Sequence, residues 1–195
     1  QRYHGVVACA LTWACWKTYL GRPEADNARL NAMSLLGLGL AGAGHHEDEL
    51  SVREAELSMR RRIGMPESKM FSVQGNLANA YTRLGRHEEA LSLSQEVYSG
   101  RLRFKGEEYY DTLLAALNYA YSLLSLRRFE EAKSLMRKTM PVARRVVGEN
   151  DDLTLKMRCI DAQSLYRDDG ATLDDLHEAV TSLEEIERTA RRVFG

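Results

Sequence analysis

Residues 77–90 read Leu77-Ala78-Asn79-Ala80-Tyr81-Thr82-Arg83-Leu84-Gly85-Arg86-His87-Glu88-Glu89-Ala90, the pattern of a helix, a glycine turn and an acidic helix start. The pattern recurs 42 residues later, where Ala120 aligns with Ala78 and Glu130-Glu131-Ala132 aligns with Glu88-Glu89-Ala90. Self-similarity at a fixed period of this length is typical of repeat architectures. The sequence therefore predicts an array of helix pairs.

Glycines that follow basic helix ends give a second measure of the period. Glycine suits the left-handed position just beyond a helix, and the arginines before it complement the negative end of the helix dipole. These glycines are separated by 43, 42, 42 and 47 residues: Gly21, Gly64, Gly106, Gly148 and Gly195. Acidic pairs mark the opposite end of each second helix, in its positive first turn: Glu47-Asp48, Glu88-Glu89, Glu130-Glu131 and Asp174-Asp175.

These signals predict an all-α fold of about nine helices, with apolar residues at helical spacing within each pair. We expect a lead helix at 3–20 and four pairs: 27–42 with 46–63, 68–84 with 87–104, 109–126 with 129–147, and 152–167 with 173–194. One array is expected over 1–195, with a lead helix in 1–22 and repeats at 23–64, 65–106, 107–148 and 149–195. The chain begins with Gln1 and not with methionine, which predicts a fragment of a longer chain.

The composition limits the classes of partner that are expected. The net charge is −1 with 28% charged residues, so no global field would attract nucleic acid or an anionic membrane. The most apolar stretch, residues 6–16, is well short of the roughly 20 residues that span a bilayer, so no membrane insertion is expected. Cys9, Cys15 and Cys159 form no paired framework, which favours a reducing, cytoplasmic setting.

The run Leu77-Ala78, Tyr81, Gly85, His87 and Ala90 resembles the tetratricopeptide signature. The 42-residue period, with Val147-Gly148-Glu149 ending a long second helix, resembles the kinesin-light-chain-like subclass. The likeness is weaker in the first repeat, where Glu49 takes the alanine position, and in the fourth, where Asp168-Asp169-Gly170 is an insertion. The resemblance implies a solenoid, a right-handed superhelix of antiparallel helix pairs, whose concave groove binds a peptide or partner protein.

The resemblance also nominates binding residues, because groove-facing first-helix residues make the contacts in such arrays. Asn76 and Asn118 match the subclass asparagine that brackets a ligand backbone, although hydrogen bonds to neighbouring helices or water would explain them equally well. The first repeat has Leu35 at this position and the fourth has Ile160. The nominated residues are Asn31, Ser34, Ser72, Asn76, Asn79, Arg83, Asn118, Tyr121, Lys156, Gln163 and Arg167.

The sequence gives little support for catalysis or for metal binding. His45-His46 beside Glu47, Asp48 and Glu49 has no third ligand at zinc-helix spacing and is better interpreted as a solvated turn. No serine or cysteine lies in a nucleophile motif, and Gly37-Leu38-Gly39 lacks the strand before it that a phosphate loop requires, so these glycines predict close helix packing or fraying. We expect no enzyme activity, no bound metal and no cofactor.

Basic clusters recur at second-helix ends, as Arg60-Arg61-Arg62 and Arg101, Arg103 and Lys105. A nucleic-acid stripe is one interpretation. Acidic residues follow each cluster, as in Glu107-Glu108. The better interpretation is therefore that the basic residues form ion pairs between repeats and cap the helix dipoles.

The predicted function is a non-catalytic scaffold or adaptor for a protein or peptide partner, with no nucleic acid among its partners. The alternative is a structural subunit of a larger complex, docked through its convex face or its ends, where Val193-Phe194 would be an exposed apolar patch. Charge reversal at Arg83, or loss of Asn76 and Asn118, should abolish groove binding and leave end docking intact.

Overall fold

A computed structural model describes the backbone of residues 2–194 and the side chains of residues 5–193. Over these residues the chain forms nine α-helices and no strand, which confirms the all-α prediction. Each helix end lies within one residue of its predicted position. The helices are α1 (Arg2–Tyr19), α2 (Asn27–Ala43), α3 (His46–Arg62), α4 (Glu67–Arg83), α5 (His87–Lys105), α6 (Tyr110–Ser125), α7 (Phe129–Val146), α8 (Asp152–Tyr166) and α9 (Leu173–Phe194).

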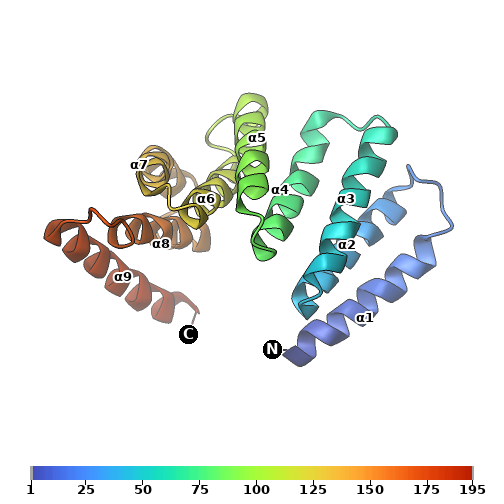
Figure 1. Ribbon diagram of the computed structural model, residues 1–195, viewed down its shortest axis with the longest axis horizontal. Coiled ribbons are helices and arrows are strands. Elements are labelled where there is room, and N and C mark those ends of the chain that lie inside the picture. Colours follow the sequence, from blue (N-terminus) through green and yellow to red (C-terminus); the bar gives the residue numbers. More distant parts are fainter. Residues whose placement is uncertain (1, 195) are drawn as a thin grey trace. The chain divides into compact units, whose positions relative to one another are not determined.

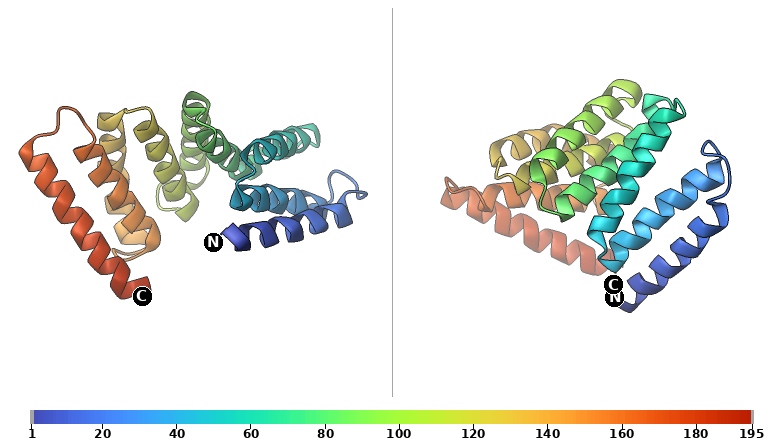
Figure 2. Two further views of the ribbon diagram at one scale, coloured as in Figure 1. Left: turned by 60° about the horizontal axis from the view of Figure 1, so that its bottom comes forward. Right: turned by 45° about the vertical axis from the view of Figure 1, so that its right-hand side comes forward.

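The helices belong to two compact units, residues 1–93 and 94–195, and the division falls inside α5. In the first unit α1 packs on α2, α2 on α3 and α3 on α4, as Figure 1 shows. In the second unit α6 packs on α7, α7 on α8 and α8 on α9, and α6 also contacts α8 (Figure 2). In each of these pairs, helices adjacent in sequence therefore pack directly against one another. None of the helices over the described residues has both the length and the apolar character of a membrane span.

Local side-chain chemistry sets the helix starts. The Asp26 carboxylate accepts hydrogen bonds from the backbone N–H groups of Ala28 and Arg29 at 2.7 and 3.2 Å and caps α2. The bond from Arg29 is the main reason that the pKa of Asp26 lies below its ordinary value. At α9, Thr172 and Asp175 exchange hydrogen bonds with each other's backbone N–H, which is a capping box.

Glycines in left-handed conformation end several helices. Gly64, Gly106 and Gly148 have φ angles of 69°, 82° and 99°, as predicted. Gly21 was expected to be left-handed too, and this was wrong. The chain after α1 instead makes a turn in which the Arg22 N–H donates to the Tyr19 carbonyl at 3.0 Å, and no positive φ is needed there. Gly195 lies outside the described residues.

Alanines allow close contact between helices of a pair. Ala90, Ala120 and Ala132 have no exposed surface, and Ala78 is 3% exposed. In the first unit Leu77 joins Leu50, Leu57 and Val73 in one apolar cluster. The small positions of the repeat thus lie inside the core, as the signature predicts.

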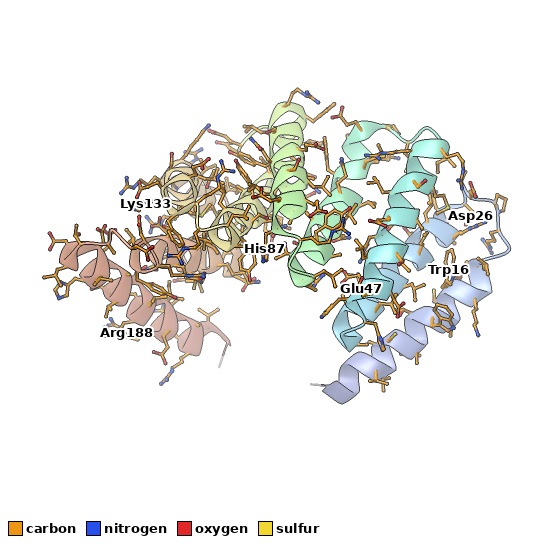
Figure 3. The ribbon with its side chains drawn as sticks, in the orientation of Figure 1. Trp16, Asp26, Glu47, His87, Lys133 and Arg188 are labelled. Atoms are coloured by element: carbon orange, nitrogen blue, oxygen red, sulfur yellow. The ribbon has the colours of Figure 1, made fainter. Side chains whose placement is uncertain are left out.

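Glycines join the lead helix to α2. A Cβ atom on Gly39 would lie 3.1 Å from the Cys9 Cα and would overlap the Thr12 hydroxyl. A Cβ atom on Gly5 would lie 2.9 Å from the Gly42 carbonyl carbon. Trp16, labelled in Figure 3, packs with Leu30 at the other end of this contact. The glycines of α2 therefore permit close packing, one of the two roles expected for them.

We predict that Gly39→Ala lowers the free energy of unfolding by about 1 to 3 kcal/mol, because the Cys9 backbone cannot move aside without shifting α1. The matched control is Gly42→Ala on the same helix, where an added Cβ meets nothing within 4 Å. The control should be neutral or gain up to about 1 kcal/mol of helix propensity. Urea unfolding followed by circular dichroism measures both; equal effects of the two substitutions would contradict the close contact.

Candidate partner-binding site

Four of the nominated residues share one face of α4. Ser72, Asn76, Asn79 and Arg83 follow one another at spacings of four, three and four residues, which places them in a line along the helix. Ser72 and Arg83 are exposed, whereas Asn76 and Asn79 are half-buried. The opposite side of α4 carries the buried residues Phe71, Gln74 and Leu77. The nominated residues are therefore a polar face on a helix whose other side is in the core.

The side-chain amides of Asn76 and Asn79 make no hydrogen bond with any residue that the structure describes. An amide offers two donor hydrogens and one acceptor oxygen. Neither amide has a fully buried atom that lacks a partner, so both remain accessible to solvent. Both amides are thus available to a ligand that can donate and accept.

Arg83 differs from these asparagines because it already has a partner in the fold. Its Nη1 lies 3.0 Å from both carboxylate oxygens of Glu49 on α3, and the Glu49 side chain is only 2% exposed. Charge reversal at Arg83 would therefore disturb a buried carboxylate as well as any partner contact. The asparagines give the cleaner test of binding.

The corresponding face of α6 combines an amide with apolar groups. Asn118 is half-buried, and its side-chain amide, like those on α4, has no partner within the described chain. Tyr121 is 52% exposed and lies one turn further along, and Leu114 is 38% exposed one turn before. This face can both hydrogen-bond and make apolar contacts.

The remaining nominated residues lie on α2 and α8. Asn31 is exposed, and the Ser34 hydroxyl is hydrogen-bonded to the Glu56 carboxylate of α3. Lys156 pairs with Asp152 at 2.5 Å on the same helix. Gln163 is half-buried and Arg167 is exposed. Ser34 therefore has a structural role, whereas Asn31, Gln163 and Arg167 lie where a partner could reach them.

Sequence reasoning missed a buried ionic cluster, which we define as Glu49, Arg53, Glu56 and Arg60 of α3. Taken as whole residues, Glu49, Arg53 and Glu56 are at most 1% exposed. The Glu56 carboxylate accepts from Arg53 at 3.2 Å and from Arg60 at 2.8 Å. Arg53 also donates to the Ser34 carbonyl of α2 at 3.1 Å. Charges buried this deeply are tolerated only when paired, so the cluster fixes α3 against α2 and, through Glu49, against α4.

Gly37 makes room for the buried guanidinium. A Cβ atom there would lie 2.5 Å from Cζ of Arg53 and 2.7 Å from its Nε. The sequence signal for the cluster is thus a combination: a glutamate at the alanine position of the repeat, an arginine four residues later, and a glycine on the preceding helix.

The basic helix ends take part in ion pairs. Arg62 contacts Glu24 at 2.5 Å and Arg101 contacts Asp111 at 2.6 Å. Arg145 contacts Glu108 at 2.7 Å. The hydrogen bond from Arg62 holds the pKa of Glu24 below its ordinary value. These three arginines therefore form ion pairs, but only the pair of Arg101 with Asp111 joins two repeats as expected, while the pairs of Arg62 and Arg145 lie within one repeat.

The histidine-rich turn does not form a metal site over the residues described. His45 and His46 each lie 3.9 Å from a carboxylate, of Asp48 and Glu49 respectively. No group of three or more His, Cys, Asp or Glu side chains in the described chain is arranged to hold a metal ion.

The second unit has an open pocket of about 390 Å³ between α7, α8 and α9, lined by Arg144, Arg158 and Asp161, with His177 and Glu178 among others. Arg158 is paired with Glu185 at 2.7 Å. Asp161 makes no side-chain hydrogen bond to a described residue. Burial is the main cause that raises its pKa above the ordinary value, and the Glu178 charge adds to the shift.

Comparison with known proteins identifies the repeat and the fold. Residues 69–145 match the family described as Tetratricopeptide repeat. A Podosopora anserina protein named as a kinesin light chain with nearly identical TPR-like repeats has a similar structure, with a TM-score of 0.72 and 17% identity over 96% of this chain and 88% of that one. A variant of it gives a TM-score of 0.74 and 16% identity over 94% and 85%. BtubC (BKLC) from P. vanneervenii has a TM-score of 0.65 and 14% sequence identity, over 96% of this chain and 91% of that one. No curated protein sequence matches the chain.

We predict that Glu56→Met lowers the free energy of unfolding by about 3 to 5 kcal/mol, because it leaves the Arg53 guanidinium buried without its closest carboxylate. The control is Glu54→Met on the exposed side of the same helix, where the loss should stay below about 1 kcal/mol. Urea unfolding of both variants decides the matter. A loss for Glu56→Met no larger than that of the control would mean that the cluster does not hold the unit together.

Asp161 gives a prediction about pH. Because its folded-state pKa is raised, the folded chain binds this proton more tightly than the unfolded chain, and stability falls as the pH rises above 3.8. Asp161→Asn should therefore be more stable than the parent at neutral pH, with the difference shrinking towards pH 4. Thermal unfolding across pH measures this, with Asp174→Asn, an exposed α9 acid, as a control expected to show no gain. A pH-independent difference would contradict the assignment.

Proposed function

We propose that this chain, a tetratricopeptide-repeat protein with the fold of kinesin-light-chain-like solenoids, is a non-catalytic scaffold that holds an extended peptide or a partner helix on the free faces of its first helices. Tetratricopeptide repeats are in general protein-interaction modules. The finer proposal concerns where the partner binds. The nominated residues on α4 are the centre of the proposed face in the first unit, and those on α6 are its counterpart in the second.

One observation supports this proposal above all: the side-chain amides of Asn76, Asn79 and Asn118 are accessible and have no partner among the described residues. Asn76 and Asn118 are 42 residues apart, one repeat period, so the same group recurs at the same helix position. A peptide main chain presents one N–H and one carbonyl per residue. An asparagine amide can bond to both, which suits recognition of a backbone without regard to its side chains.

A second candidate function is docking into a larger assembly through a terminal helix. The apolar residues Leu173, Leu176, Val180 and Leu183 of α9 are 74%, 39%, 55% and 36% exposed, at the three- and four-residue spacing of one helix face. Val193 is 46% exposed. The other residue named for this end, Phe194, has a side chain outside the described set. An apolar face of this kind would suit a protein contact that does not use the asparagines.

The two functions are separated by an affinity pull-down from the source cell with the parent chain and an Asn76→Ala, Asn118→Ala variant. We expect the partner to be lost from the variant, since each substitution removes an amide that no other described residue uses. Asn150→Ala, in an exposed turn, is the matched control and should retain the partner. Circular dichroism must show the same helix content in all three chains. Equal recovery by parent and variant, with loss from Val180→Ser instead, would favour docking through α9.

A further inference from the structure

A groove in the first unit lies between α1, α2 and the start of α3. Val6, Ala10 and Trp13 follow one another at spacings of four and three residues, which places them in a line along α1. Close packing at Gly39 brings this helix directly against α2. The groove has a volume of about 360 Å³, and its lining on the two helices consists of Val6, Cys9, Ala10, Trp13, Leu40 and Ala43.

The walls that α1 and α2 provide are apolar. Val6 is 57% exposed and Trp13 is 47% exposed, so both side chains are open to a bound molecule. Over the described residues, neither helix contributes a charged side chain to the lining. Ligand pockets are typically lined by apolar and aromatic side chains and have volumes of about 300 to 1,000 Å³. The groove therefore has the size and the lining that suit a small apolar group such as a phenyl ring.

The start of α3 adds two polar side chains to the groove, His45 and Asp48. The Nδ1 atom of His45 lies 3.9 Å from the Asp48 carboxylate, and no lysine or arginine in the described part of the chain pairs with this aspartate. The Asp48 side chain is 73% exposed, so a bound group can reach it. The groove thus combines an apolar wall with a carboxylate whose charge a cationic ligand would complement.

The ring of Trp13 favours the same sign of charge. The Nζ atom of Lys17 lies 5.8 Å from the centroid of this ring, so the ring already attracts a cation within the fold. Tryptophan is the aromatic side chain that attracts cations most strongly, through the negative face of its ring. An ammonium group in the groove would be attracted by both Trp13 and Asp48, whereas a carboxylate group would be repelled.

We propose that this groove is a binding site for a small amine with an apolar body. The body packs against Val6, Trp13 and Leu40, and the ammonium group pairs with the Asp48 carboxylate. The site does not use the amides of α4 and α6, so it goes beyond the proposed function and does not rest on it.

The probes are 2-phenylethylamine, 2-phenylethanol and 3-phenylpropionate, which share a phenyl ring and differ in charge. The only two tryptophans of the chain, Trp13 and Trp16, are both on α1, so tryptophan fluorescence reports binding at this groove. We expect a saturable change with the amine, with an affinity about two- to fivefold higher than that of the alcohol, the range of an exposed ion pair. The carboxylate should bind more weakly than the alcohol. No saturable change with the amine would overturn the proposal.

Two variants test the ligand's charge. Asp48→Asn should remove the advantage of the amine over the alcohol, because it removes the carboxylate that the ammonium group contacts. Glu54→Gln removes the same charge further along α3, outside the groove, and should leave the advantage unchanged. An advantage that persists in Asp48→Asn, or that is absent from the parent chain, would mean that the ligand class is wrong.

A second pair of variants tests the place of binding. Ala10→Leu fills the groove and should abolish the fluorescence change with all three probes. Ala14→Leu makes the same change at an exposed position of α1 outside the lining and should bind the probes as the parent chain does. Binding that survives Ala10→Leu would show that the site is wrong. A parent chain that dimerises in sedimentation experiments, while Ala10→Leu stays monomeric, would show instead that a second copy covers the groove. Circular dichroism must give the same helix content for every variant.

Discussion

Ala90 and Ala132 have no exposed surface, and each stands at the position of the repeat where the second helix of a pair begins its contact with neighbouring helices. A larger side chain at such a position must find a place in the packed interior. In the first repeat the residue is Glu49, and its carboxylate is buried as deeply as the alanine methyl groups. The buried Glu49 carboxylate is paired with Arg83 of α4. The buried Arg53 guanidinium is in turn paired with Glu56 and occupies the space that the missing side chain of Gly37 leaves.

This constraint explains why α3 has buried charges where α7 has none. The residues of α7 that align with Glu49, Arg53 and Arg60 are Ala132, Met136 and Ala143, all buried and uncharged. A buried ion pair contributes little net stability over apolar packing, but it is costly to break and tolerates only one arrangement of its partners. The cluster therefore fixes the register of α2, α3 and α4 more than it strengthens their contact.

Helix ends could be predicted to within a residue because their determinants are local: acids in the first turn, arginines in the last, and glycine beyond. Gly21 shows where this local reasoning fails: it follows a helix as the other glycines do, but a turn before Pro23 removes the need for a left-handed residue. The ionic cluster was not predicted because Glu49, Arg53, Glu56 and Arg60 have the spacing of exposed pairs on one helix. Their burial depends on Gly37 of another helix, which spacing within α3 cannot reveal. For the same reason Arg83 was nominated as a binding residue without its intramolecular partner being foreseen.

The free faces of the first helices carry no such constraint, and there the repeats diverge. The face of α2 has leucines, that of α4 has amides, that of α6 has both, and that of α8 has Lys156, Gln163 and Arg167. Since none of these residues is needed to close the core, the differences between repeats cannot be attributed to packing. Within either unit, first helices that contact a partner through different chemical groups would require this kind of variation on a repeated scaffold. The buried side of each first helix thus determines the fold, and the exposed side, which differs between repeats, is where partner choice can be encoded.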